Sequence, residues 1–216
     1  MEIKYFGHSC FLLRDKNVTL LTDPFSPEVG LKLPRIAADI VTITHDHYDH
    51  NNTGIVQAKM REEPFIIKGP GEYEVKGVGI IGMSSYHDEQ KGKERGRNTL
   101  YHLEIDGVNF IHLGDLGTML SKEDIEKLDG VDVLFVPVGG IFTITAEQAQ
   151  TVISELEPSI VIPMHYKTGK HSTEFKELAS LQLFLKIMGK EDVRPVSKLS
   201  ITKDKLPTEM QIVVLE

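Results

Sequence analysis

A dense cluster of ionisable side chains lies at residues 45–50, which read HDHYDH, directly after the strand-like segment DIVTIT at residues 39–44. In an extended chain alternate side chains share a face, so His45 and His47 point to the same side and can share one metal ion. Asp46 and Tyr48 then face away. A turn towards a helix near residues 51–53 would swing the following Asp49-His50 pair onto a new direction, which suits a second ion.

Three interpretations of this cluster are open: a metal site, a polar turn rich in histidine, or a catalytic cluster that needs no metal. Hydrogen bonds in a polar loop are the common fate of a single histidine. Four such residues at positions i, i+2, i+4 and i+5 after an apolar strand argue against that reading. Cys10 is the single cysteine, so a disulfide within the chain and a cysteine-based metal cluster are both excluded. Any metal must be held by nitrogen and oxygen.

Length and composition indicate an ordinary globular protein. The 216 residues are 40% apolar and 26% charged, which favours one domain over residues 1–216. No apolar stretch approaches the roughly 20 residues that span a bilayer, and the N-terminus lacks the pattern of a signal peptide, so a cytoplasmic location without a membrane partner is expected. The formal charge of −8 disfavours nucleic acid as a partner without excluding it. A homo-oligomer, most commonly a dimer, is compatible with the sequence.

Short β segments alternate with helical patterns along the chain, which predicts an α/β fold with two packed sheets, helices covering them, and loops at one edge free to build a site. Helices are expected at residues 53–61, 121–128, 145–156 and 172–189. Strands are expected at residues 2–6, 10–14, 17–23, 39–44, 65–68, 77–83 and 131–138, in a hairpin over 99–113 that turns at Asp106-Gly107, and at 198–202 and 210–216.

Further candidate metal ligands follow other apolar runs. A zinc ion in such a site takes about four ligands, one of them water where the site is catalytic. His87, Asp115 and His165 each end an apolar run and precede a loop. Together they fit one edge of a core made of two sheets.

The motifs THDHYDH, TDP upstream of it, LGD downstream and a late IPMHY resemble those of the metallo-β-lactamase superfamily, in the same order and over almost the whole chain. The segments FGHSCFLL, PGEYEV and VPVGG are similar to a branch of small bacterial and archaeal metal-dependent hydrolases that includes ascorbate-6-phosphate lactonase. The resemblance implies an αββα sandwich, with two mixed sheets packed face to face and helices on their outer faces.

The same resemblance implies which ligands hold which ion. His112 is an alternative to His87 as a ligand because it lies three residues before Asp115. In a strand His112 would be out of phase with Asp115, which favours a role in the core or beside the ligands. Asp23 would support the ligand loop through hydrogen bonds. The first ion would be held by His45, His47 and His87, the second by Asp49, His50 and His165, and Asp115 would bridge the two.

Two further groups are candidates for contact with substrate. The segment Gly7-His8-Ser9 suits a tight turn, but the resemblance implies that this turn reaches the cleft, where His8 would contact substrate or donate a proton. The catalytic candidates are His8 and, among the proposed ligands, Asp49. The charged segment 87–98 suits a mobile, solvated loop. Its basic residues and one later lysine could meet a phosphate or carboxylate, although solvent exposure explains them equally well: Lys93, Arg95, Arg97 and Lys167.

The expected function is hydrolysis by two divalent ions about 4 Å apart that share a hydroxide and polarise the substrate. Zinc suits the ligands best, and manganese or iron would also be accepted. The expected substrate is a small anionic ester, lactone or phosphodiester. The alternatives are a nuclease or nucleotide phosphodiesterase, since relatives on this fold cleave such substrates, and a binding module that the metal merely stabilises. Oxygen or nitric oxide reduction by di-iron relatives would usually need a flavin-bearing partner domain.

Overall fold

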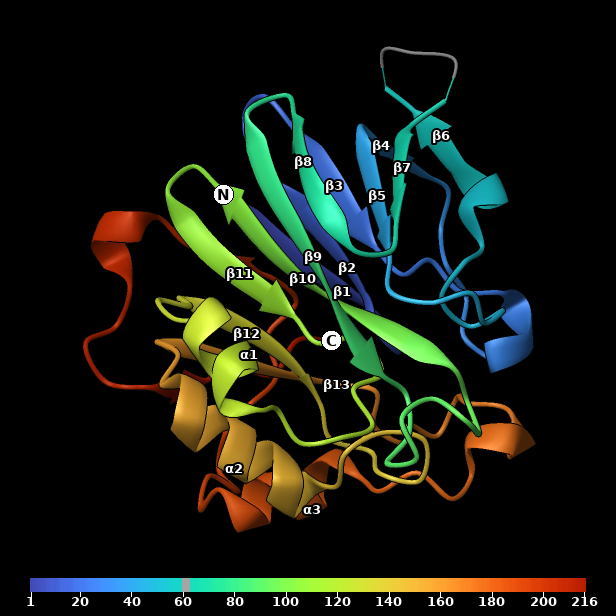
Figure 1. Ribbon diagram of the computed structural model, residues 1–216, viewed down its shortest axis with the longest axis vertical. Coiled ribbons are helices and arrows are strands. Elements are labelled where there is room, and N and C mark those ends of the chain that lie inside the picture. Colours follow the sequence, from blue (N-terminus) through green and yellow to red (C-terminus); the bar gives the residue numbers. More distant parts are fainter. Residues whose placement is uncertain (60–62) are drawn as a thin grey trace.

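Two β-sheets packed face to face form the centre of the molecule, seen in a computed structural model that describes residues 1–59 and 63–216 (Figure 1). The six-stranded sheet has the order β14-β1-β2-β3-β5-β7, and the seven-stranded sheet the order β15-β13-β12-β11-β10-β9-β8. The strands of the first sheet are β1 (Glu2–Gly7), β2 (Cys10–Arg14), β3 (Thr19–Thr22), β5 (Ile40–Ile43), β7 (Phe65–Lys68) and β14 (Leu199–Ser200). Those of the second are β8 (Gly71–Val75), β9 (Val78–Tyr86), β10 (Arg97–Ile105), β11 (Val108–His112), β12 (Val133–Pro137), β13 (Ile160–Met164) and β15 (Gln211–Ile212).

The remaining elements are short. A two-stranded sheet joins β4 (Ile36–Ala38) to β6 (Val56–Ala58). The α-helices are α1 (Lys122–Lys127), α2 (Ala146–Leu156) and α3 (Leu181–Ile187). The 3₁₀ turns are η1 (Pro27–Val29), η2 (Thr53–Ile55), η3 (Thr173–Phe175) and η4 (Lys203–Lys205). No helix in the described part of the chain is both long and apolar enough to cross a bilayer.

Both faces of the central strands are buried, and alternate residues serve different layers of the core. In β12, Val133 and Phe135 face the other sheet, while Leu134 and Val136 pack against the helices. Side chains alternate in a strand, so a continuous apolar run such as this one is what a strand with two covered faces requires. The central core is therefore enclosed between the two sheets.

The outer layers of the two sheets differ. Helices α2 and α3 cover the seven-stranded sheet beside β12 and β13 (Figure 1). The outer face of the six-stranded sheet packs against Phe25, Val29 of η1 and Phe175 of η3. The α/β sandwich predicted from the sequence is confirmed. In the described ranges, however, the layer over the six-stranded sheet consists of 3₁₀ turns, loops and the β4-β6 pair, where α-helix was expected.

Local signals in the sequence were sufficient for several elements. The hairpin between β10 and β11 turns at Asp106 and Gly107, whose φ angles of 52° and 72° are left-handed as a tight hairpin turn requires. Helices α1 and α2 begin after Ser121 and Thr145, each with a complete capping box.

One predicted helix is wrong, and a second is correct over only part of its length. Residues 53–58 form η2 and strand β6, which pairs with β4, so partner strands overrode the helical pattern; residues 60 and 61 of that prediction lie outside the described residues. The helix predicted over 172–189 is divided into η3 and α3. Between them Ala179 donates its N–H to Gly139 and accepts one from Lys167, and these bonds to other segments replace helical ones. Strands β4 and β8 were not predicted.

Candidate metal centre

Five strand ends meet at one edge of the two sheets. Strands β3 and β5 run parallel in the first sheet. In the second, β11, β12 and β13 are parallel, and β9 has the same direction because both β9 and β11 are antiparallel to β10. Parallel strands end at a common edge, so the residues that follow them converge: Asp23, His45, His87, Asp115 and His165.

Most donor atoms at this edge fall into two groups, and a third set, His45, His50 and Asp115, joins them. His45, His47 and His87 offer ring nitrogens that lie within 4.8 Å of one another. The second group contains Asp49, His50 and His165, as the sequence predicted, and also His8. The structure thus brings every predicted ligand into one centre and adds His8 to the second group.

Asp115 lies between the two groups. Its Oδ1 is 3.3 Å from Nε2 of His50, and its Oδ2 is 3.3 Å from Nε2 of His87 and 3.2 Å from Nε2 of His165. Oδ2 is also 4.0 Å from Nε2 of His45. A carboxylate in this position faces donors of both groups, which is the arrangement that a bridging ligand needs.

Buried atoms without partners show that these residues fit a divalent ion. Among the described residues, Nε2 of His45, Nε2 of His50, both ring nitrogens of His165 and Oδ1 of Asp115 have no hydrogen-bond partner. Buried polar atoms are rarely left unpaired, because the cost is about 1–3 kcal/mol for each. Imidazole and carboxylate donors are also the set that zinc and related ions accept.

Asp23 and Thr44 fix the orientation of two imidazoles. Oδ2 of Asp23 accepts a hydrogen bond from Nδ1 of His50 at 2.8 Å, which directs Nε2 of that ring into the centre. The same carboxylate accepts the N–H (2.8 Å) and the hydroxyl (2.6 Å) of Thr44. Since the Thr44 hydroxyl donates to Asp23, its oxygen is left to accept from Nδ1 of His45 at 3.1 Å. Asp23 therefore has the supporting position that the sequence suggested.

The turn at His8 reaches the centre. His8 is fully buried, and its Nε2 lies 3.0 Å from Oδ2 of Asp49. Its carbonyl accepts the N–H of His165 at 2.8 Å and the hydroxyl of Tyr5 at 2.8 Å. Burial and the neighbouring His165 lower the pKa of His8 to about 3, so its imidazole is neutral at pH 7.

Three residues of the centre have left-handed backbone conformations. The φ angles are 55° for His8, 38° for Asp23 and 51° for His165. Residues other than glycine adopt this region at a cost of about 1–2 kcal/mol. In each case the chain leaves a strand in a sharp turn that keeps the side chain at the edge of the sheet.

Burial and neighbouring charges set the protonation of the donors. Burial lowers the pKa of His45 and His47, which favours the neutral imidazole that binds metal. Burial opposes ionisation of Asp115, but His165 and His50 hold its pKa well below the ordinary value. Burial likewise opposes charge on His50, yet the carboxylates around it, Asp115 first, raise its pKa well above the usual range.

The other singled-out residues lie beside the centre. Nε2 of His112 bonds the carbonyl of Ser9, and its Nδ1 accepts the N–H of Gly114, so it supports the turn before Asp115 and belongs to neither donor group. The structure thus favours His87 over His112 as a ligand. Asp46 accepts a hydrogen bond from Asn51 and Tyr48 donates one to Glu174, and neither residue belongs to a donor group.

Sequence reasoning missed Thr44 and Asn98. The Asn98 Oδ1 accepts the N–H of Asp115 at 3.0 Å, and its Nδ2 donates to the carbonyl of Leu113 at 2.9 Å. Its only sequence signal is a position between the charged segment and the apolar run that follows. Nothing in that signal indicates that Asn98 holds the turn at Asp115.

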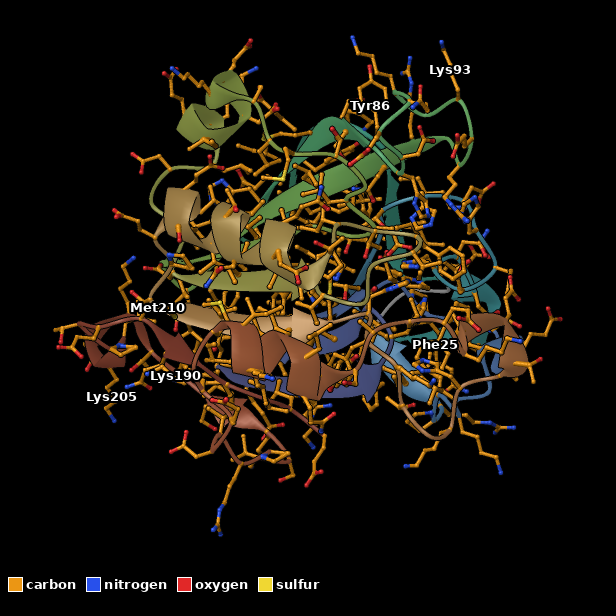
Figure 2. The ribbon with its side chains drawn as sticks, turned by 90° about the horizontal axis from the view of Figure 1, so that it is seen from below. Phe25, Tyr86, Lys93, Lys190, Lys205 and Met210 are labelled. Carbon is orange, nitrogen blue, oxygen red and sulfur yellow. The ribbon has the colours of Figure 1, made fainter. Side chains whose placement is uncertain are left out.

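A cavity of about 330 Å³ opens onto the centre. His47, Asp49, His87 and Asp115 line it together with Asp46, Tyr48, Arg95, Phe142, Glu174 and Phe175. Of the basic residues considered for anion binding, only Arg95 lines this cavity. Lys93 extends away from the body of the molecule (Figure 2). Arg97 is exposed on β10, and Lys167 donates to the carbonyl of Lys176.

Comparison with known proteins gives consistent matches. A family model described as a β-lactamase superfamily domain matches residues 2–165. A UPF0173 metal-dependent hydrolase of Thermococcus onnurineus is 30% identical over 207 residues, covering 82% of this chain and 92% of that protein. A protein of the same name from Lysinibacillus sphaericus is 30% identical over 195 residues, covering 78% of this chain and 86% of the relative.

Solved structures give the same result. A protein of Thermotoga maritima, described as a zinc-dependent hydrolase of the metallo-β-lactamase superfamily, is 35% identical with a TM-score of 0.80, over 100% of this chain and 98% of the other. An isothiocyanate hydrolase from gut bacteria of Delia radicum has a TM-score of 0.69 over 94% of this chain and 100% of the other, at 17% identity. That second likeness concerns the fold alone.

Proposed function

Because this chain belongs to the metallo-β-lactamase superfamily and is a metal-dependent hydrolase of that superfamily, we propose that it uses two divalent ions to hydrolyse a small anionic ester, lactone or phosphodiester. The observation that carries the proposal is Asp115, whose two carboxylate oxygens face different members of two donor groups. His45, His47 and His87 would hold one ion, and Asp49, His50 and His165 the other.

Zinc is the ion we propose first, and manganese or iron would also suit nitrogen and oxygen donors. Bound ions of this kind supply Lewis acidity and make water nucleophilic near neutral pH. No nucleophilic side chain is then required, which agrees with the burial of Ser9 and Cys10 away from the cavity.

The chain's own residues divide the remaining work. Asp49 lines the cavity, whereas His8 is fully buried behind it and contacts Asp49 through Nε2. We therefore assign Asp49 the position nearer to substrate. His8 orients the Asp49 carboxylate and can hold a proton at Nε2 for that contact. This differs from direct proton donation by His8 to a leaving group, because the cavity lining does not include His8.

The cavity favours a small substrate. Its volume of about 330 Å³ lies near the lower end of the range for ligand sites, roughly 300–1,000 Å³. Phe142 and Phe175 give it an apolar wall, and Asp46 and Glu174 add acidic groups at its lining. Together with a net charge of −8, these features favour a small molecule over a nucleic acid.

Substitution of the central carboxylate tests the proposal. Asp115→Ala should lower metal-dependent hydrolysis by at least about 100-fold and reduce bound metal, because it removes the group between both donor sets. His47→Ala should do the same while the fold, checked by circular dichroism, is retained. Activity is measured on a lactone panel, p-nitrophenyl esters and bis-p-nitrophenyl phosphate, and metal content by elemental analysis.

The exposed Asp192 supplies the matched control, since Asp192→Ala makes the same change far from the donor groups. Full activity and metal content in Asp115→Ala would overturn the proposal. Hydrolysis of the phosphodiester alone would favour the nuclease or nucleotide phosphodiesterase. Hydrolysis of lactones or carboxylic esters alone would exclude it.

A further inference from the structure

Arg95 lies close to the metal centre. It lies in the segment between His87 and Asn98, and its side chain lines the cavity over the metal centre. A second cavity of about 410 Å³ adjoins the first, and His87, Arg95 and Phe142 line both. Arg95 therefore stands at the border of the two cavities, beside one of the proposed ligands.

Hydrogen bonds within the segment hold the backbone that carries Arg95. The buried carboxylate of Asp88 accepts four backbone N–H bonds, from Gln90 (2.8 Å) and Gly92 (2.9 Å) through Oδ1 and from Glu94 (3.1 Å) and Arg95 (2.8 Å) through Oδ2. The N–H of His87 donates to the carbonyl of Gly96, which closes the segment onto the ligand. The segment expected from composition to be a solvated turn is thus organised around one carboxylate.

The guanidinium of Arg95 is oriented but not neutralised. Its Cζ lies 4.3 Å from the centre of the Phe142 ring, a cation–π contact that holds the planar group against one wall. Within residues 1–59 and 63–216, no carboxylate oxygen lies within 4.0 Å of it. A guanidinium stacked by its face leaves its N–H groups at the edge, where they can donate two parallel bonds to a carboxylate or phosphate.

The other charged groups of the cavity make this arginine distinctive. In the part of the chain that the structure describes, Arg95 is the one lysine or arginine that lines the cavity, against the carboxylates of Asp46, Asp49, Asp115 and Glu174. Asp49 belongs to the second donor group, Asp115 lies between the two groups, and Glu174 accepts a hydrogen bond from Tyr48. A cation that faces the cavity without an ion-pair partner can donate hydrogen bonds to an anionic group of a substrate.

Resting on the proposed hydrolytic function, we propose that Arg95 is the specificity-determining residue, which binds an oxyanion of the substrate, a carboxylate or phosphate group separate from the bond that is cut. Phe142 and Phe175, whose rings make an edge contact at 6.1 Å, receive the apolar part between that group and the scissile bond. The substrate class is thus an ester or lactone that carries a second, negatively charged group.

Matched ester substrates test this assignment. The mono-p-nitrophenyl ester of glutaric acid carries a remote carboxylate, the corresponding ester of 4-phosphonobutyric acid a remote phosphonate, and p-nitrophenyl butyrate no charge. All three have the same leaving group. The metal-loaded wild type is compared with Arg95→Met, which keeps an unbranched side chain against Phe142, and with Arg95→Lys, which keeps the charge and loses the planar fork.

In Arg95→Met the ratio of kcat/KM for an anionic ester to kcat/KM for the neutral ester should fall about 10- to 100-fold, as expected for loss of a charge-assisted hydrogen bond. Arg95→Lys should retain part of the preference. The anionic ester with the larger loss identifies the preferred group. Lys93→Met is the control, since Lys93 is exposed in the same segment and lines neither cavity. An unchanged ratio in Arg95→Met would overturn the inference.

Binding without turnover separates this inference from the proposed function. The anilide of glutaric acid is titrated calorimetrically into wild type, Arg95→Met and Lys93→Met. Its affinity should fall about tenfold or more in Arg95→Met alone. If the wild type cleaves no ester but shows this loss of binding, the proposed hydrolysis fails and the anion site stands. If the esters are cleaved and neither ratio nor affinity depends on Arg95, the anion site fails and the hydrolysis stands.

Discussion

Two donor imidazoles, those of His45 and His50, form a hydrogen bond to a supporting side chain through one ring nitrogen. The other ring nitrogen is left free to bind an ion. His50 bonds Asp23 through Nδ1, and His45 bonds Thr44 through Nδ1. The Nε2 atoms of both rings consequently face Asp115. Because Asp23 also holds Thr44, one carboxylate fixes a ring in each donor group.

Asp23→Asn should weaken metal binding about 10- to 100-fold, because an amide in place of the carboxylate cannot accept from both His50 and Thr44 with the same strength. Affinity is measured by competition with a chromophoric chelator. Asp192→Asn is the control for the loss of one negative charge. Unchanged affinity in Asp23→Asn would show that the ligand orientation does not depend on this carboxylate.

Asp39 contributes to the stability of the fold and has no part in the metal centre. Its carboxylate accepts the N–H of Thr19 at 2.9 Å and Nζ of Lys76 at 2.7 Å. Burial opposes ionisation, but Lys76 and Thr19 lower the pKa of Asp39 below its ordinary value. A lowered pKa in the folded state contributes stability above the unfolded pKa of about 3.9, and this contribution is lost as pH falls through the folded value.

The free energy of unfolding should therefore fall more steeply below about pH 4 in the wild type than in Asp39→Asn, so that the two variants converge in acid. Urea denaturation between pH 3 and pH 7 measures the difference. Parallel pH profiles would exclude a contribution from the ionisation of Asp39.

The sequence predicted the residues that carry unusual chemistry better than those that support them. His45, His47 and the other proposed ligands belong to recognisable motifs after apolar runs. Thr44 and Asn98 do not, because threonine at a strand end and asparagine at a strand start are common in any protein. Their supporting role arises only when the fold brings strands distant in sequence to one edge of the sheets. The local sequence pattern does not indicate that arrangement.

At the scale of elements, the segment from His87 to Asn98 shows how a loop without regular structure is held. Four of its backbone N–H groups are satisfied by Asp88 in place of a neighbouring strand. In the sequence Asp88 resembles an ordinary surface charge, but in the structure the segment is organised around its carboxylate. Buried backbone groups must find partners, and here a side chain provides them.

Asp88→Asn should therefore speed hydrogen exchange at the amides of Gln90, Gly92, Glu94 and Arg95, because one amide oxygen replaces two charged acceptors. Exchange followed by mass spectrometry on peptides covering 87–97 measures the change. Asp129→Asn is the control, since Asp129 accepts a single N–H in an exposed turn. Unchanged exchange in 87–97 would show that other contacts order the segment.

Elements with their own start signals were predicted, and those decided by partners were not. Capping boxes at Ser121 and Thr145 mark α1 and α2 locally. By contrast, residues 56–58 pair with β4, and residues 176–180 bond to segments near Gly139 and Lys167. Pairing of this kind overrides helical periodicity, and the sequence of the segment alone does not reveal it.

For the whole molecule, the donors link both sheets. Asp49 and His50 follow a strand of the six-stranded sheet, whereas His87, Asp115 and His165 follow strands of the seven-stranded sheet. Each donor group takes residues from both sheets, so ions held by the two groups would stabilise the folded chain over the unfolded one, since the unfolded chain does not assemble the donors.

Removal of metal should lower the midpoint of thermal unfolding by about 5–10 °C. This corresponds to about 2.7 kcal/mol for an ion at 100 times its dissociation constant, with a shift of about 2–4 °C per kcal/mol in a chain of this size. Scanning calorimetry with zinc or with dipicolinate measures it, and added zinc should restore the midpoint. Asp115→Ala should show little difference between the two conditions. A midpoint in the wild type that is independent of metal would contradict the link between the sheets.

The left-handed turns at His8, Asp23 and His165 have a consequence for protein design. A designer who transferred this centre to another scaffold by copying side chains alone would place them on strands that continue straight past the edge. The backbone turns would need to be copied as well, and an idealised scaffold avoids them at residues other than glycine. The transferable unit is thus a set of strand endings with their side chains, and it includes the strain that the surrounding sheets must support.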